Sequence, residues 1–202
     1  MLTRILHGLM ANPRVYDLVQ SLVGAAEVHR RLARQVELVR DARLVLDLGG
    51  GTGLVSELFA ARGGGGKYVC LDIDPAKLEG FRAKYPAGLA LQADAAHIPL
   101  ADATLDAAVC TNVSHHLPGD VFPQMLAEVA RVLRPGGTFV FLDAVWNPTR
   151  WAGRVIWRYD RGSFPRTAHA IRAAIAGVLN VEHWEQFAIH HEYALCVARR
   201  ER

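Results

Sequence analysis

Glycines and a carboxylate are concentrated in the stretch Asp47-Leu-Gly-Gly-Gly-Thr-Gly53, which follows a short apolar run. Glycines at alternate positions let the backbone turn sharply and lie against a ligand with no side chain between them. The apolar residues after Gly53 recur at helical spacing, so the turn leads into a helix whose free N–H groups and dipole favour an anion. The stretch therefore predicts a strand, a glycine turn and a helix that bind an anionic ligand. A loop that merely joins the strand to the helix is the alternative.

A second carboxylate stands at the distance that nucleotide-binding folds require. The predicted strand 67–72 ends in Asp72, 21 residues after Gly51. A carboxylate in this position can accept hydrogen bonds from both ribose hydroxyls of a nucleoside, and such charge-assisted bonds contribute about 1.5–3 kcal/mol each. Asp74 precedes Pro75 at the predicted start of the next helix, where it can serve as an N-cap, so Asp72 is the stronger ribose candidate.

The rest of the chain must position these groups, and its apolar patterns alternate between strands and helices. With 202 residues and no repeat or linker, we expect one domain over residues 1–202, in which residues 1–42 form N-terminal helices. The alternation is typical of a doubly wound α/β domain. Predicted strands cover residues 44–48, 67–72, 88–92, 105–111, 138–142, 181–187 and 192–198. Predicted helices begin near residues 13, 28, 52, 75, 118 and 166.

Composition and charge argue against several classes of protein. Although 51% of the residues are hydrophobic, no apolar run reaches about 18 residues, so no membrane span is predicted. The N-terminus lacks the long apolar core of a signal peptide. A net charge of +3 gives no reason to expect a nucleic-acid partner. Cys70, Cys110 and Cys196 lie in strand-like contexts without metal-ligand spacing, which predicts buried, reduced thiols in a cytoplasmic protein and no metal site.

The order of these motifs resembles the class I S-adenosylmethionine-dependent methyltransferases. The pattern from Asp47 is similar to the first motif of that family, whereas a dinucleotide-binding Gly-x-Gly-x-x-Gly would put a glycine where Leu54 stands. An NAD-dependent oxidoreductase is further disfavoured because the chain has no evident Tyr-x-x-x-Lys pair. The stretch EVARVLRPGGTFVFLD is similar to the helix, turn and strand that close the cofactor half in these enzymes. The resemblance covers residues 43–143. It implies a three-layer, Rossmann-like α/β fold with a seven-stranded sheet in the order 3-2-1-4-5-7-6 and strand 7 antiparallel.

The resemblance also implies which residues hold the cofactor. The glycine turn would lie at the methionine end of S-adenosylmethionine, and Asp72 at the ribose. An acid after the third strand binds the adenine amino group in this family, and Asp94 stands in the matching place, with a loop-capping aspartate as the alternative. The residues implied to contact S-adenosylmethionine, or its product S-adenosylhomocysteine, are Tyr16, Asp47, Gly49, Gly50, Gly51, Gly53, Asp72, Ile73, Asp94, Ala95, Asn112 and His115.

Within the family, the chain most resembles the small-molecule enzymes related to the ubiquinone and menaquinone C-methyltransferases. A Tyr-Asp pair in an N-terminal helix covers the cofactor there, and Tyr16-Asp17 stands in the matching place. A His pair after the fourth strand also occurs in that branch, and His115-His116 matches it. Nucleic-acid enzymes that methylate amino groups carry an Asn/Asp-Pro-Pro-aromatic motif, whereas Asn112 is followed here by Val-Ser-His.

The resemblance implies methyl transfer from S-adenosylmethionine to a small-molecule acceptor, at an oxygen or a carbon. Proton removal from such an acceptor by a general base contributes roughly 10²–10⁴ to the rate. His116 is the first candidate for that base and His115 and Asp143 follow it, while a satisfied polar residue near a strand end is the alternative for each. Further candidates are Tyr159, Asp160 and His169. The second hypothesis is a protein that binds S-adenosylmethionine but has a regulatory role or catalyses a different reaction.

Residues 144–165 are expected to form a substrate-covering insertion. They include Trp146, Trp151 and Trp157, which can hold a flat or lipid-like acceptor, and three arginines at helical spacing that can hold an anionic group. A basic, tryptophan-bearing helix can instead lie on a membrane surface, and a packed helix with exposed arginines is a third interpretation. We expect a monomer or a homodimer.

Overall fold

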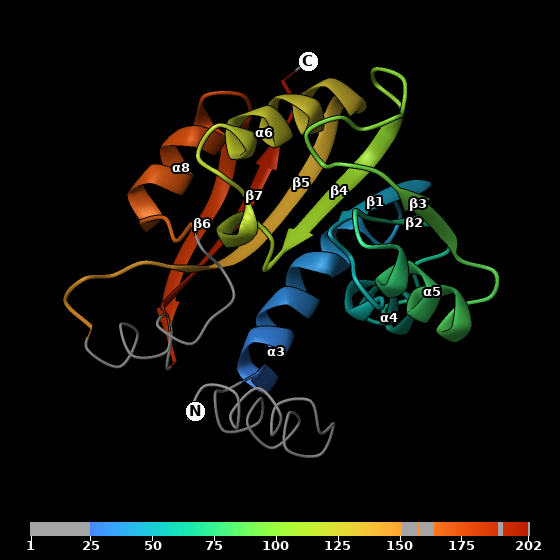
Figure 1. Ribbon diagram of the computed structural model, residues 1–202. Helices are drawn as coiled ribbons and strands as arrows, with labels where there is room; N and C mark the ends of the chain where they lie inside the picture. Colours follow the sequence, from blue (N-terminus) through green and yellow to red (C-terminus); the bar gives the residue numbers. More distant parts are fainter. Residues whose placement is uncertain (1–24, 151–156, 158–163, 190–191, 202) are drawn as a thin grey trace.

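The computed structural model describes residues 25–150, 157, 164–189 and 192–201 (Figure 1). Tyr16, Asp17 and the helix expected from residue 13 lie outside the described residues, and so does most of the expected insertion at 144–165. The described chain folds around one sheet of seven strands in the order β3-β2-β1-β4-β5-β7-β6. Neighbours among β1 to β5 run parallel, and β7 is antiparallel to both β5 and β6. The predicted strand order and the antiparallel strand 7 are therefore confirmed.

Six of the seven strands begin within one residue of their predicted positions. The strands are β1 (Leu44–Leu48), β2 (Lys67–Asp72), β3 (Leu89–Gln92), β4 (Leu105–Thr111), β5 (Leu133–Val145), β6 (Asn180–Ala188) and β7 (Glu192–Arg199). The α-helices are α3 (Ala25–Val36), α4 (Leu54–Ala61), α5 (Pro75–Lys84), α6 (Val121–Val132) and α8 (Ala168–Ala176). Two short 3-10 helices, η1 (Glu37–Val39) and η2 (Ser114–His116), follow α3 and β4.

Strand β5 is longer than predicted because residues 134–137 stay in the sheet. Leu105 of β4 pairs with Leu133, and Ala107 then pairs with Thr138, so the register shifts over the intervening residues. Gly136 has a φ of +77°, a left-handed conformation that glycine adopts without strain. The structure accommodates the predicted turn as a bulge within the strand.

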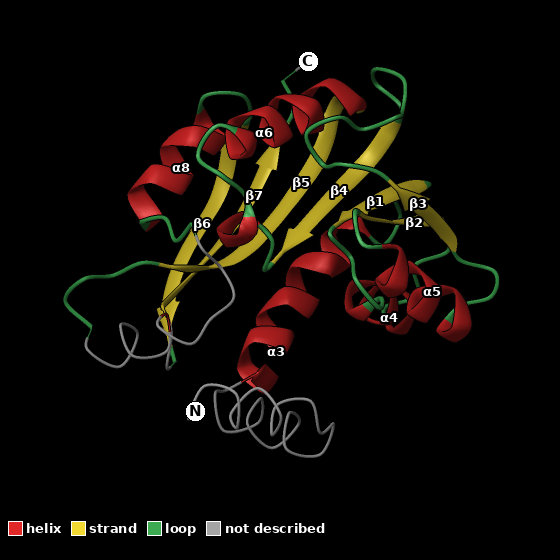
Figure 2. Cartoon of the chain, in the orientation of Figure 1, coloured by secondary structure: helices red, strands yellow, loops and turns green. Residues whose placement is uncertain are grey.

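Helices cover both faces of the sheet and give the three layers of the fold (Figures 1 and 2). Helices α3, α4 and α5 pack on one face, because the side chains of a strand alternate between faces and β1, β4 and β5 present apolar residues such as Val45, Val109 and Val140 on this side. The predicted stripe of α3 and η1, which is Val28, Leu32, Val36 and Val39, is buried there. Burial of this stripe attaches the start of the described chain to the sheet.

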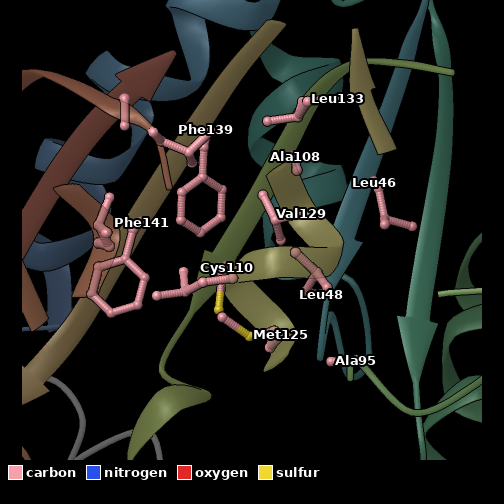
Figure 3. Close-up of a cluster of buried hydrophobic side chains, with 14 of the residues drawn as sticks. Leu46, Leu48, Ala95, Ala108, Cys110, Met125, Val129, Leu133, Phe139 and Phe141 are labelled. Carbon is pink, nitrogen blue, oxygen red and sulfur yellow. The ribbon is translucent and has the colours of Figure 1, made fainter. Parts of the chain in front are cut away.

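Helices α6 and α8 pack on the opposite face. Figure 3 shows Leu46 and Leu48 of β1, Cys110 of β4 and Met125 and Val129 of α6 in this second cluster of buried side chains. Apolar residues occupy both sets of alternate positions in β1, so this strand is covered on both faces, as central parallel strands are.

The three cysteines are buried, as predicted. Burial raises the pKa of Cys70 and of Cys196 to about 12 and that of Cys110 well above its ordinary value, so their thiols stay protonated and unreactive. Across the part of the chain that the structure describes, no helix has the length and apolar character needed to cross a bilayer.

Candidate cofactor and active site

The carboxyl ends of the parallel strands meet at one edge of the sheet, and the predicted site residues follow these ends. The glycine loop follows β1, Asp72 ends β2, Asp94 follows β3, His115 follows β4 and Asp143 lies near the end of β5. Ligands of open α/β sheets bind at this edge, where neighbouring connections diverge to opposite faces. The fold therefore brings together groups from five strands.

The glycine loop, residues 49–53, joins β1 to α4 in a conformation that favours glycine. Gly49, Gly51 and Gly53 have φ values of +65°, +54° and +94°, and Gly53 occupies the N-cap position of α4. A Cβ on Gly49 would lie 2.4 Å from Cγ2 of Val113, so this glycine lets the segment after β4 approach the loop. A Cβ on Gly51 would meet no atom closer than 3.9 Å. The backbone around Gly51 is therefore the part of the loop that has open space beside it.

Asp47 is fully buried below the loop, and only one of its carboxylate oxygens has a partner. The Tyr68 hydroxyl donates to Oδ2 at 2.5 Å, whereas Oδ1 accepts no hydrogen bond from the described residues. Burial raises the pKa of Asp47 to about 7, although the Tyr68 hydrogen bond lowers it, and the charge of Asp72 raises it further. Burial and Asp47 also raise the pKa of Tyr68, so its hydroxyl stays a donor. An orphaned oxygen here is ready to accept a hydrogen bond from a ligand.

Asp72 is buried at the end of β2 and connects the glycine loop to α5. The backbone N–H of Gly51 donates to its Oδ2 at 3.1 Å and that of Asp74 donates to its Oδ1 at 2.9 Å. Lys77 Nζ lies 3.7 Å from the same Oδ2. Because two carboxylate oxygens accept about four hydrogen bonds, Asp72 keeps capacity for hydroxyl donors. Asp74 accepts from the N–H of Ala76 at 2.9 Å, so it is indeed the N-cap of α5.

The residues expected near the adenine and the sulfur lie along the same edge. Ile73, which follows Asp72, is 68% exposed. Asp94 accepts from the N–H of Ala96 at 2.9 Å, so it makes the loop-capping contact that was the alternative interpretation, while its side chain is exposed at the edge. Ala95 is buried. Asn112 has a φ of +54°, which turns the chain sharply at the end of β4.

Ser114, His115 and Asp143 form a buried polar network beside this edge. Asp143 accepts from the Ser114 hydroxyl at 2.5 Å and from the backbone N–H of Ala144 at 2.8 Å, and His115 Nδ1 lies 2.5 Å from its Oδ1. Because a carboxylate only accepts, Nδ1 donates in this contact, and in the neutral form of the ring the proton acceptor is then Nε2. An acid that holds an imidazole in this tautomer is the arrangement of a general base.

His116, the first candidate from the sequence, lies on the exposed side of His115. The two ring centroids are 4.1 Å apart, and the ring of Trp157 meets His115 edge-on at 5.6 Å. Asp143 orients His115 rather than His116. The geometry therefore favours His115 as the base, with Asp143 as its positioning residue.

Arg166 fixes the loop that carries His115, and no pattern in the sequence indicated this role. Its guanidinium donates to the carbonyl oxygens of Leu117 at 2.8 Å and Pro118 at 2.9 Å, and also to that of Ser114. It lies 4.6 Å from the centroid of the Phe122 ring. Burial lowers the pKa of Arg166, and the charge of Asp143 opposes this effect. Tyr68 was also missed, because an isolated strand tyrosine carries no signal of its partner.

The remaining candidates fall elsewhere. Tyr159 and Asp160 lie outside the described residues, and His169 is exposed on α8, where it lines a separate hollow. Among the residues that the structure describes, no group of three or more His, Cys, Asp or Glu side chains could hold a metal ion.

Comparisons with known proteins point to one domain family. Residues 46–141 match the family model for a methyltransferase domain. A protein of Mycobacterium sp. (strain JLS) named as an uncharacterized methyltransferase is 36% identical over 111 residues, which cover 54% of this chain and 42% of that protein. The chain thus matches less than half the length of this relative.

Two solved structures share the fold. The protein bound to the Trm112 methyltransferase activator in a Haloferax volcanii complex has a TM-score of 0.73 at 20% identity, over 92% of this chain and 95% of its own. A geranyl diphosphate methyltransferase in complex with GPP and sinefungin has a TM-score of 0.68 at 17% identity, over 83% of this chain and 77% of its own. At these identities the structures support the fold.

The strand order, the family match over residues 46–141 and the site residues are all similar to those of class I methyltransferase domains, whose methyl donor is S-adenosylmethionine. The residues present fit this cofactor. The loop has open space beside Gly51, Asp47 has an orphaned buried oxygen, and Asp72 retains acceptor capacity where a ribose would lie.

Proposed function

We propose that this protein transfers the methyl group of S-adenosylmethionine to an oxygen or an acidic carbon of a small-molecule acceptor. The observation that carries the proposal is the contact between His115 Nδ1 and Asp143 Oδ1 at 2.5 Å, at the same sheet edge as the glycine loop. A scaffold that only binds the cofactor has no use for a buried, oriented imidazole, whereas an acceptor that must lose a proton does.

The cofactor supplies a methyl group on a positively charged sulfur, which is already an electrophile. The open backbone at Gly51 and the carboxylate of Asp72 bind and orient the donor, and this positioning is worth about 7–11 kcal/mol of the barrier in well-oriented reactions. His115 Nε2 accepts the proton of the acceptor. Asp143 keeps the ring in the required tautomer and stabilises the imidazolium that forms.

Two observations support a small acceptor rather than a macromolecule. The net charge of +3 is weak for a nucleic-acid enzyme, and one protein of the same fold is a geranyl diphosphate methyltransferase. The pair His115-His116 favours the branch related to the ubiquinone and menaquinone C-methyltransferases, in which Tyr16 would cover the cofactor. We also propose a single cytoplasmic domain that works as a monomer or homodimer, since the described core forms one layered unit.

Calorimetric titration with S-adenosylhomocysteine, with NADH as the control ligand, tests the cofactor. We expect micromolar binding of the first ligand only, weakened in Asp72→Ala. A screen of hydroxylated and enolisable small molecules with labelled methyl donor then tests transfer. Cofactor binding with no turnover on any acceptor would instead support a regulatory or non-methylating protein, and binding of neither ligand would overturn both.

A further inference from the structure

A hollow lies beyond the end of β5, and none of its lining residues belongs to the glycine loop. It has a volume of about 390 Å³, which is enough for a small organic molecule. Its lining comes from the segment after β5, the start of α8, strand β6 and the first residue of β7. Figure 1 shows α8 beside β6. Its lining residues are Trp146, Asn147, Pro148, Thr167, Ala168, His169, Arg172, Trp184, Gln186 and Glu192.

The hollow combines flat apolar surfaces with a positive charge. Trp146 and Trp184 are half-buried, so each presents part of its indole ring to the space. The guanidinium of Arg172 stands 5.9 Å from the Trp184 ring centroid, and no carboxylate of the described residues forms an ion pair with it. His169 lies three residues before Arg172, on the same side of α8. A cation beside indole rings favours a flat anion.

The one acid in the hollow is already engaged. Asn147 Nδ2 donates to Glu192 Oε2 at 2.6 Å. The Gln186 amide, in the orientation that satisfies both of its neighbours, donates to Glu192 Oε1 at 3.2 Å and accepts from Trp184 Nε1 at 3.0 Å. Glu192 therefore orders the walls of the hollow, while Arg172 remains as the charge that a ligand can neutralise.

The walls of the hollow are connected to the polar network around His115 through the chain and through hydrogen bonds. Trp146 follows Asp143 by three residues, so their backbones are at most roughly 10 Å apart at the strand rise of 3.2–3.4 Å per residue. The N–H of Trp146 donates to the carbonyl oxygen of Arg166 at 2.7 Å, and the Arg166 guanidinium holds the carbonyls of the His115 loop. The hollow and the His115 loop are therefore close neighbours along β5 and the segment that carries Arg166.

We infer that this hollow binds the remote end of the methyl acceptor, and that this end is a flat ring system bearing a carboxylate. The inference rests on the proposed function and names its substrate class. The carboxylate pairs with Arg172, the ring packs on Trp146 and Trp184, and the atom that accepts the methyl group extends toward His115. Arg172 is thus a specificity-determining residue, which favours acids over neutral molecules of the same shape.

Naphthoate and naphthylmethanol, which share a ring system and differ in charge, test this inference by calorimetry on the whole chain. We expect naphthoate to bind at least about tenfold more tightly than the alcohol, and Arg172→Gln to remove this preference. Arg34→Gln changes another exposed arginine, on α3, and should leave the preference intact. Failure of naphthoate to bind, or equal binding in Arg172→Gln, would overturn the inference.

Two further experiments distinguish the proposed acceptor site from a failure of cofactor binding and from membrane binding. Titration of the same variants with S-adenosylhomocysteine reports on the proposed function, because Arg172 is remote from the glycine loop and its loss should leave that affinity unchanged. Co-sedimentation with phosphatidylglycerol vesicles tests a membrane surface as the occupant. Vesicle binding that Arg172→Gln abolishes, without any naphthoate binding, would replace the small-molecule assignment.

Discussion

The two halves of the ligand-binding edge are built in different ways. In the cofactor half, Asp47 meets Tyr68 and Gly51 meets Asp72, each across 21 residues of one strand–helix–strand unit. In the acceptor half, His115 meets Asp143 across 28 residues and Arg166 meets Ser114 across 52. The cofactor half holds its ligand largely through backbone geometry, whereas the acceptor half depends on side chains from distant segments. Substitutions should therefore have separable effects in the two halves.

The largest expected effect belongs to the acceptor half. His115→Ala removes the proposed base, so we expect turnover to fall by roughly 10²–10⁴ while the affinity for S-adenosylhomocysteine changes much less. Methyl-transfer rates and calorimetry measure the two quantities. His116→Ala is the matched control, because His116 is the neighbour that Asp143 does not orient. Equal losses in both variants would remove His115 from the proposed role.

The next largest effect is on the stability of the cofactor half, and it depends on pH through Asp47. The folded protein keeps the proton of Asp47 up to about pH 7, whereas the unfolded chain releases it near its ordinary pKa of 3.8. Between these values the folded state binds more protons, so this contribution to stability is complete below about pH 4 and is lost as the pH rises. Asp47→Asn lacks this dependence, and its stability relative to wild type should rise by up to roughly 4 kcal/mol from pH 4 to pH 7.

Urea unfolding of both proteins across this pH range measures the difference. The difference in free energy of unfolding between the two proteins reports on Asp47, because the other titrating groups contribute equally to both curves. Parallel curves would mean that Asp47 is ionised in the folded protein, and the buried oxygen Oδ1 would then have a partner in solution.

Two variants of the glycine loop, Gly49→Ala and Gly51→Ala, distinguish its role in packing from its role in ligand binding. Gly49→Ala puts a Cβ 2.4 Å from a methyl group of Val113, a stiff β-branched side chain, at a φ of +65°, and should cost roughly 3 kcal/mol of stability. Gly51→Ala meets open space and should cost only about 1–2 kcal/mol for its left-handed φ, yet it should weaken cofactor binding more. Thermal unfolding and S-adenosylhomocysteine titration check both. Val113→Ala should relieve the contact with the new Cβ and recover part of the stability lost in Gly49→Ala, and it should recover none in Gly51→Ala.

The contrast between the halves also explains what the sequence could predict. The strands were predictable because runs such as Leu44–Leu48 are apolar on both faces and end at glycine or aspartate. Asp74 was predictable as a cap because its partner, Ala76, is two residues away. The resemblance supplied the strand order, which local patterns alone do not contain.

The acceptor half was less predictable because its contacts are non-local. His115 and His116 are adjacent and of one residue type, and only the position of Asp143 distinguishes them. Arg166 carries no periodic signal, since its acceptors are backbone carbonyls that any residue provides. The bulge at residues 134–137 depends on pairing with β4, so the sequence could indicate the turn but not its place in the sheet.

The smallest effects are expected from replacing two helix caps, one in each half. Asp74 caps α5 beside the cofactor residues, and Thr167 caps α8 beside the hollow by accepting from the N–H of Ala170 at 3.2 Å. Replacing either cap with alanine should cost about 1 kcal/mol of stability. Because each cap orders only its own half, Asp74→Ala should weaken S-adenosylhomocysteine binding, whereas Thr167→Ala should weaken naphthoate binding. If both variants altered both ligands equally, the two halves would form one cooperative unit, and the division drawn from their contacts would be wrong.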